Sequence, residues 1–243
     1  MRGAQLEVIG IGTDADGICP LAADWRRHCP KLIYTTPSHQ YPTGSVLTLA
    51  RRLELIDRAR AAGALIIEDD YASEFRHDGP PLPAMQGLEP DAPVVYLGTF
   101  SKTMFPAPRI GFLVVPRALS GPLAALTARS APAGRTNEQL ALAQFLRDGQ
   151  FALHLRRMRR LYRQRRDALA KALQAQLGDV GKVHGGSAGM HLAFQFNDAR
   201  LDDRALSRAA LAAGIVAPAL GEHATGAREW VERVSARVCP APR

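Results

Sequence analysis

Short apolar runs alternate with a helical pattern through the first two thirds of this 243-residue chain, and this alternation is the strongest constraint on its fold. The runs are rich in β-branched and aromatic residues, and each ends at a polar residue or a proline, as strands do. Four strands are expected, at residues 32–36, 65–67, 94–98 and 110–115. Strands in alternation with helix predict an α/β fold with a mostly parallel sheet.

The helical segments are expected from apolar residues that recur with a period of about 3.6. Residues 47–62 place Leu49, Leu53 and Ile56 on one face, and Gly63 is typical of a helix end. Residues 138–177 carry one long helix or two, with a break at Asp148-Gly149.

The last third of the chain predicts a separate, small α+β unit. Residues 190–196 alternate as a strand does, and residues 201–213 form a helical pattern. We therefore expect three parts: a large domain over residues 1–154, a small C-terminal domain over residues 155–220, and a divergent tail over residues 221–243.

The composition is that of a folded, non-membrane protein. Hydrophobic residues make up 47% and charged residues 22% of the chain, and no apolar run reaches the roughly 20 residues that a membrane span needs. The N-terminus has no signal-peptide pattern. The three cysteines match no metal-binding or disulfide spacing, so a cytoplasmic location and no metal site are expected.

The net charge of +8 is concentrated in one stretch, residues 156–166, which holds seven arginines. A basic helix can bind nucleic acid, or it can simply expose its charged face to solvent. Apolar residues occupy the opposite side of this helix, which favours the solvated face.

Three polar clusters follow predicted parallel strands, at residues 38–44, 69–71 and 99–109. Ligands of open α/β sheets bind beyond the carboxyl ends of the strands, so the three clusters are expected to form one site.

Each candidate residue in these clusters has a chemical and a structural interpretation. Lys102 follows a strand among hydroxyl residues and can form a Schiff base with a carbonyl, or be an ordinary surface lysine. Asp69 can pair with a cationic ring nitrogen or cap a loop. Tyr71 can donate to a ring oxygen or only pack. Arg109 suits a phosphate because its guanidinium is bidentate, or lies on the surface.

Together, Pro42-Thr43-Gly44, residues 68–71, Ser101-Lys102 and residues 109–111 resemble the motifs of fold-type I, class I/II aminotransferases, which bind pyridoxal 5′-phosphate (PLP). The longer strings narrow this resemblance to the aminotransferase-like domain of MocR/GabR-type regulators of the GntR family. They are residues 36–44, 68–75 and 96–102. The resemblance covers about residues 5–220.

The resemblance implies a role for each matching residue. Lys102 would form a Schiff base with PLP and later move the proton between the substrate Cα and the cofactor C4′. Asp69 would keep the pyridine nitrogen protonated, which makes the ring an electron sink. Tyr71 would donate to the ring oxygen O3′. Tyr41 stands where the family usually has an asparagine that contacts the same oxygen. The phosphate would be bound by Thr99, Ser101 and Arg109.

The resemblance also implies a function and leaves alternatives. We expect a PLP-binding protein that transaminates an amino acid or amine, as a homodimer. The alternatives are an effector-sensing regulatory domain and an inactive fragment, because family members are longer at the N-terminus and their C-terminal strand is not matched after Leu220. No winged helix is recognised, so direct DNA binding is not expected.

Overall fold

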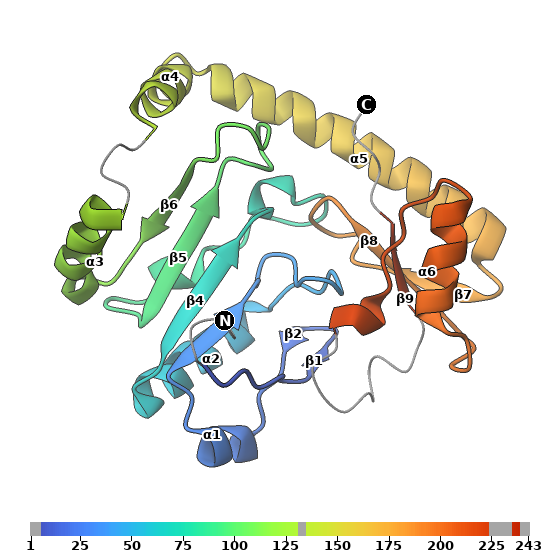
Figure 1. The fold of residues 1–243 in the computed structure, drawn as a ribbon, viewed down its shortest axis with the longest axis horizontal. Coiled ribbons are helices and arrows are strands. Elements are labelled where there is room, and N and C mark those ends of the chain that lie inside the picture. Colours follow the sequence, from blue (N-terminus) through green and yellow to red (C-terminus); the bar gives the residue numbers. More distant parts are fainter. Residues whose placement is uncertain (1–5, 131–134, 224–234, 239–243) are drawn as a thin grey trace.

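The computed structural model describes residues 6–130, 135–223 and 235–238. Its central sheet has the order β3-β4-β5-β6, formed by Leu32–Thr35, Leu65–Asp70, Val94–Thr99 and Gly111–Val114 (Figure 1). The first three strands are parallel, which confirms the predicted α/β fold. Strand β6 runs antiparallel to β5, because a loop without a crossover helix connects them and the chain turns straight back.

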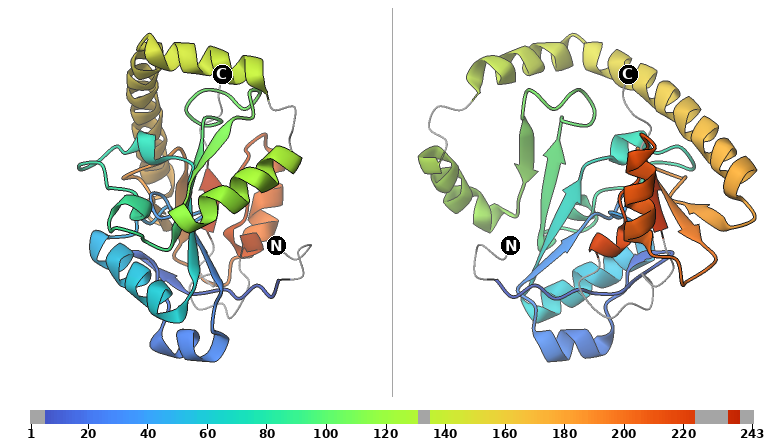
Figure 2. Two further views of the ribbon diagram at one scale, coloured as in Figure 1. Left: turned by 90° about the vertical axis from the view of Figure 1, so that its left-hand side faces the viewer. Right: turned by 45° about the vertical axis from the view of Figure 1, so that its right-hand side comes forward.

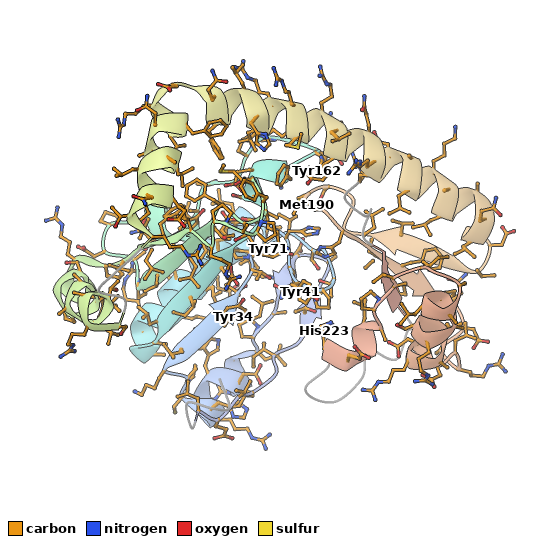
Figure 3. The ribbon with its side chains drawn as sticks, turned by 45° about the horizontal axis from the view of Figure 1, so that its top comes forward. Tyr34, Tyr41, Tyr71, Tyr162, Met190 and His223 are labelled. Atoms are coloured by element: carbon orange, nitrogen blue, oxygen red, sulfur yellow. The ribbon has the colours of Figure 1, made fainter. Side chains whose placement is uncertain are left out.

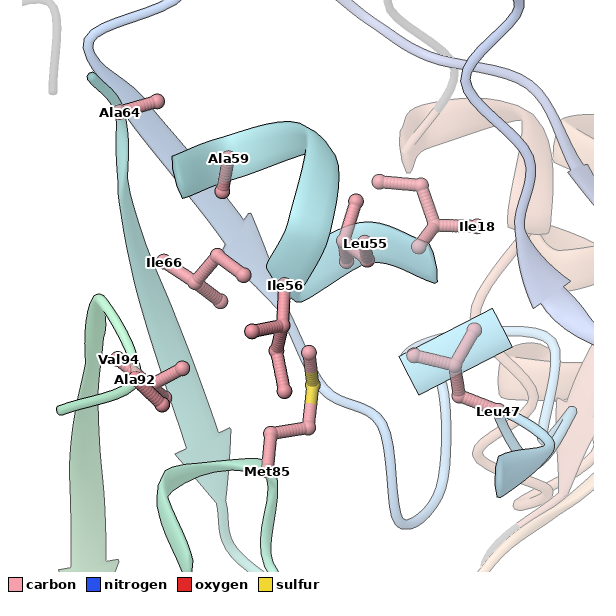
Figure 4. Close-up of a cluster of buried hydrophobic side chains, with 10 residues drawn as sticks. All are labelled: Ile18, Leu47, Leu55, Ile56, Ala59, Ala64, Ile66, Met85, Ala92 and Val94. Atoms are coloured by element: carbon pink, nitrogen blue, oxygen red, sulfur yellow. The ribbon is translucent and has the colours of Figure 1, made fainter. Parts of the chain in front are cut away.

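Helix α2 (Leu49–Ala62) connects β3 to β4 and covers one face of this sheet (Figure 2). The core between them is a cluster of buried apolar side chains from α2, β4 and β5 (Figure 4). It includes Leu55, Ile56, Ala59, Ile66 and Val94. Gly63 ends the helix with φ of 61°, as its position in the sequence predicted. The prediction that Leu49 lies on the buried face of α2 is wrong, because its side chain is exposed. In the first turn of α2 the buried side chain is that of Arg52.

The opposite face of the sheet is more open. Leu32, Tyr34 and Leu113 lie on it and are 46–51% exposed. Tyr34 pairs with Ile67 of β4, and Leu113 pairs with Leu97 of β5, so these side chains share one face across the four strands. A ligand that approaches the strand ends from this side meets no helix of the α2 layer.

Several elements were not predicted from sequence. A short hairpin of β1 (Thr13–Asp14) and β2 (Gly17–Ile18) precedes α1 (Ala22–His28). The 3₁₀ turns η2 (Ser73–Phe75) and η3 (Met85–Gly87) lie in the loop between β4 and β5. Each is too short to show a periodic pattern.

Three helices follow β6. They are α3 (Arg117–Ser130), which was not predicted, α4 (Thr136–Arg147) and α5 (Gln150–Leu177). The predicted break between the last two is confirmed, because Gly149 has φ of +71°, a left-handed conformation that favours glycine. Helix α5 continues from the central sheet to a second, smaller sheet (Figure 1).

The second sheet is antiparallel, with the order β7-β8-β9. Its strands are Gly181–His184, Leu192–Phe196 and Ser235–Val238. Helix α6 (Asp203–Ala212) and the turn η4 (Leu220–His223) complete this part. Strand β9 lies within residues 221–243, the segment expected to be a divergent tail, and pairs with β8 over the whole of β9.

Three of the arginines in the basic stretch bind backbone carbonyls outside α5. Arg159 donates to the Glu74 carbonyl at 2.6 Å, and Arg163 donates to the His77 carbonyl. Arg166 donates to the Gly186 carbonyl at 2.6 Å. Because these carbonyls belong to the loop after β4 and to the turn after β7, α5 ties the two sheets together.

Arg52 is completely buried and is fixed by three loop and helix-end carbonyls. Its guanidinium donates to the carbonyls of Leu47, Pro83 and Pro37 at 2.9–3.0 Å. Glu68 is also completely buried, with a carboxylate oxygen 3.9 Å from Arg52. Burial disfavours the charged form of each group, so it lowers the pKa of Arg52 and raises the pKa of Glu68.

We predict that Arg52→Met lowers the free energy of unfolding by about 3–5 kcal/mol, because it leaves three carbonyls without their donor and the buried Glu68 carboxyl without its cationic neighbour. Urea denaturation measures this. The control is Arg58→Met, which removes only an exposed pair with Glu54 and should cost less than about 0.5 kcal/mol. Equal losses in the two variants would contradict the prediction.

Candidate functional site

The register of β4 and β5 places Asp69 and Thr99 on the same face of the sheet. Asp69 pairs with Leu97, and Thr99 follows two residues later on the same side of the pleat. Both residues lie at the carboxyl ends of adjacent parallel strands, where the sequence placed the candidate site. This face is the open one, opposite α2.

The neighbouring acids of β4 point to the covered face and already have partners. Glu68 accepts the backbone N–H groups of Met85 and Gln86 at 2.9 and 3.1 Å. Asp70 accepts the hydroxyl of Tyr96 at 2.8 Å. Of the three consecutive acids, Asp69 is therefore the one placed to meet a ligand on the open face.

Asp69 accepts a hydrogen bond from the hydroxyl of Tyr34, which lies on β3. Tyr34 was not singled out from the sequence. The alternation of the predicted strand at residues 32–36 would have placed Tyr34 on one face, but only the register with β4 shows that this is the face of Asp69.

Lys102 lies in the turn that follows β5 and is exposed. The turn is closed at its start, where the Ser101 N–H donates to the Thr99 hydroxyl at 3.1 Å, and at its base, where the Phe100 N–H donates to the Ile110 carbonyl at 3.1 Å. The amine of Lys102 thus extends from a turn whose two ends are held together.

Arg109 is exposed at the far end of the same loop, directly before Ile110 and β6. It has φ of +53°, a left-handed conformation that is uncommon for a residue with a side chain. The backbone N–H of Arg109 donates to the Pro106 carbonyl at 3.2 Å. The closed loop therefore carries the cationic groups Lys102 and Arg109 together with the hydroxyls of Thr99 and Ser101.

Tyr71 donates its hydroxyl to the His39 carbonyl at 2.7 Å. This bond connects the end of β4 to the loop after β3, so the two polar clusters that the sequence placed together do meet. The predicted contact of Tyr71 with a ring oxygen stays a prediction.

Tyr41 lies where the loop after β3 meets the second sheet and η4. Its ring packs edge-on against the ring of His191, with centroids 5.8 Å apart, and against the ring of His223, with centroids 5.1 Å apart. Figure 3 shows Tyr41 and His223. The backbone N–H of Tyr41 donates to the Thr36 hydroxyl at 2.9 Å. Tyr41 therefore contributes to the contact between the two sheets, and its predicted contact with a ring oxygen stays a prediction.

Glycines allow this contact to be close. A Cβ on Gly44 would lie 2.5 Å from Cα of Gly185, and one on Gly189 would lie 2.2 Å from the ring of His39. Gly44, Gly185 and Gly189 all have positive φ. A side chain at these positions would separate the loop after β3 from the second sheet.

Among the described residues, no group of three or more His, Cys, Asp and Glu side chains could hold a metal ion. The part of the chain that the structure describes also contains no helix long and apolar enough to cross a membrane.

The chain belongs to the aminotransferase class I and II family, whose model matches residues 10–241. The match indicates PLP as the cofactor of this class, and it extends through most of the segment expected to be a divergent tail.

Two relatives and one solved structure show the range of similar proteins. The chain is 42% identical to the probable rhizopine catabolism regulatory protein MocR of Rhizobium meliloti and 38% identical to the HTH-type transcriptional regulator YhdI of Bacillus subtilis. These matches cover 88% and 85% of this chain, and 42% and 44% of those proteins.

The structure of Pyrococcus horikoshii kynurenine aminotransferase superimposes with a TM-score of 0.82 at 24% identity, over 95% of this chain and 58% of that one. The resemblance seen in the sequence, to class I/II aminotransferases and MocR-type regulators, is confirmed.

His77 is a further buried group that the sequence did not single out. It is 5% exposed, with Nε2 2.9 Å from the Gly189 carbonyl, and its backbone N–H donates to the Ser187 carbonyl at 2.9 Å. Burial lowers the pKa of His77 below its usual 6.5, and the charges of Arg166 and Arg163 act in the same direction.

Because the pKa of His77 is lower in the folded protein, the unfolded chain binds a proton at this histidine before the folded protein does. The free energy of unfolding should therefore fall as the pH falls through 6.5. The denaturation midpoint of the wild type should drop between about pH 7.5 and about pH 5.5 by more than that of His77→Gln. Glutamine keeps a donor for the Gly189 carbonyl but does not titrate. The same pH dependence in both proteins would contradict the assignment to His77.

Proposed function

We propose that this chain binds PLP through Lys102 and supports transamination of an amino acid or amine. One observation carries the proposal: Asp69 and Thr99 share the open face at adjacent strand ends, and the closed turn after Thr99 presents the Lys102 amine. PLP has a cationic ring nitrogen, which a carboxylate can pair with, and an aldehyde, which an amine can bind. It also has a phosphate, which hydroxyl and guanidinium groups can bind. The residues present therefore fit PLP.

Each residue would do a distinct task. The Lys102 Nζ would bind the cofactor's aldehyde carbon and later move a proton to and from the substrate Cα. Asp69 would hold the proton on the ring nitrogen. When bound, the cofactor supplies a ring that withdraws electrons from the substrate Cα.

The remaining candidates would position the cofactor. Thr99 and Ser101 would bind the phosphate through their hydroxyls, and Arg109 would bind it through its guanidinium. Tyr71 would exchange its bond to the His39 carbonyl for one to the ring oxygen, with Tyr41 on the neighbouring loop. The glycine contacts between Gly44 and the second sheet keep that loop in place.

A second candidate function is an effector-sensing domain that binds PLP and an amino compound without turnover. It is favoured by the two regulators, which are 42% and 38% identical to this chain. The chain spans less than half of each regulator's length. The same Lys102 and Asp69 would serve both functions, so the site alone does not separate them.

We also propose a homodimer in the cytoplasm. The fold similarity to aminotransferases supports the oligomeric state. Cys19 and Cys29 are free thiols in the structure, which agrees with a reducing compartment.

We predict that the purified chain mixed with PLP shows a visible absorption band that Lys102→Ala loses, and that borohydride fixes the cofactor onto Lys102. Lys171→Ala, which removes an exposed lysine of α5, is the matched control and should keep the band. A band that survives in Lys102→Ala would refute the assignment. The absence of a band in the wild type would favour an inactive fragment.

A loaded chain then allows the two functions to be distinguished. Amino compounds should be screened with 2-oxoglutarate as the amino acceptor, and glutamate formation should be measured over many turnovers. Repeated turnover supports the transaminase, whereas a shift of the band on addition of an amine, with no glutamate formed, supports the sensing domain.

A further inference from the structure

Tyr34 and Asp69 form a pair across two adjacent strands on the open face. The Tyr34 hydroxyl donates to Oδ2 of Asp69 although the residues are 35 positions apart in the sequence. Tyr34 pairs with Ile67 in the register of β3 and β4, and Asp69 follows Ile67 by two residues, so the side chains of Tyr34 and Asp69 lie on the same face of the sheet.

The bond leaves the other carboxylate oxygen for a ligand. Within residues 6–130, 135–223 and 235–238, Tyr34 is the donor found on Asp69, and it occupies Oδ2. A carboxylate accepts hydrogen bonds at both oxygens, so Oδ1 can accept an N–H from the open face while the phenol restrains the carboxylate plane.

The phenol is suited to remain a donor. Partial burial raises the pKa of Tyr34, and the hydrogen bond and charge of Asp69 raise it further, so the hydroxyl stays protonated at neutral pH. The Tyr34 phenol therefore donates to Asp69 and does not take the proton from a ligand N–H.

A second pair, Tyr96 with Asp70, has the same chemistry on the covered face. The Tyr96 hydroxyl donates to Oδ2 of Asp70 at 2.8 Å, and the Ser73 N–H donates to Oδ1 at 3.0 Å. Both oxygens of Asp70 are therefore used within the protein. The contrast marks Asp69 as a carboxylate that is held at one oxygen and open at the other.

We propose that Tyr34 is a positioning residue that orients the Asp69 carboxylate toward the protonated ring nitrogen of the bound cofactor. The inference rests on the proposed function, and it assigns a task to a residue that the motif resemblance did not include.

The test compares the dissociation constants of the full chain for PLP and for an analogue whose ring nitrogen is replaced by a C–H group. Tyr34→Phe should weaken PLP binding about tenfold, the order expected when a charge-assisted hydrogen bond loses its alignment. Binding of the analogue should not change, because it presents no N–H to Asp69. Tyr96→Phe, the matched control, should alter neither constant.

A double-mutant cycle separates positioning from a structural effect. In an Asp69→Asn background, Tyr34→Phe should have no further effect on PLP binding. Far-UV circular dichroism and urea denaturation check that each variant folds, and Tyr34 is 46% exposed, so removal of its hydroxyl should leave the core intact.

The outcomes distinguish this inference from the proposal beneath it. Equal weakening of PLP and analogue by Tyr34→Phe, or no weakening of either, would overturn the role of Tyr34 while leaving the binding of PLP by Lys102 intact. If the wild-type chain binds no PLP, both the inference and the proposed function fail.

Discussion

The buried guanidinium of Arg52 is the interaction on which the site depends most. It binds carbonyls on both sides of the loop between β3 and α2, at Pro37 and Leu47, and one in the loop before η3. The loop it encloses carries Tyr41 and the Pro-Thr-Gly motif. Burying a charge costs free energy, and removing its carbonyl partners once it is buried costs more. The guanidinium therefore fixes one conformation of this loop, which has few apolar side chains of its own.

The pleat of β4 then gives three adjacent acids three different surroundings. Glu68 and Asp70 turn toward the covered face, where backbone N–H groups and a phenol satisfy them. Asp69 turns to the open face. The strand therefore combines two structural carboxylates with one that is placed for a ligand, which is how a run of like charges is accommodated in one strand.

The connection between the two sheets combines polar bonds with ring contacts at close range. Arginines of α5 reach backbone carbonyls of both parts, and glycines let the loop after β3 approach the second sheet within contact distance. This arrangement places Tyr41 between the parts, where its ring packs against His191 and His223. A scaffold of this kind can support catalysis or ligand sensing, because the same fold and site occur in proteins with different functions.

The sequence by itself determined the α/β class, the strands of the central sheet, the α4–α5 break and the motif residues, because these depend on local periodicity, on glycine and on residue order. Tertiary structure decided the rest. No local pattern shows that Arg52 replaces Leu49 in the core, that Tyr34 meets Asp69, or that Arg159 and its neighbours bind carbonyls. Those contacts join residues far apart in the chain, and they follow from strand register and from the need of buried polar groups for partners.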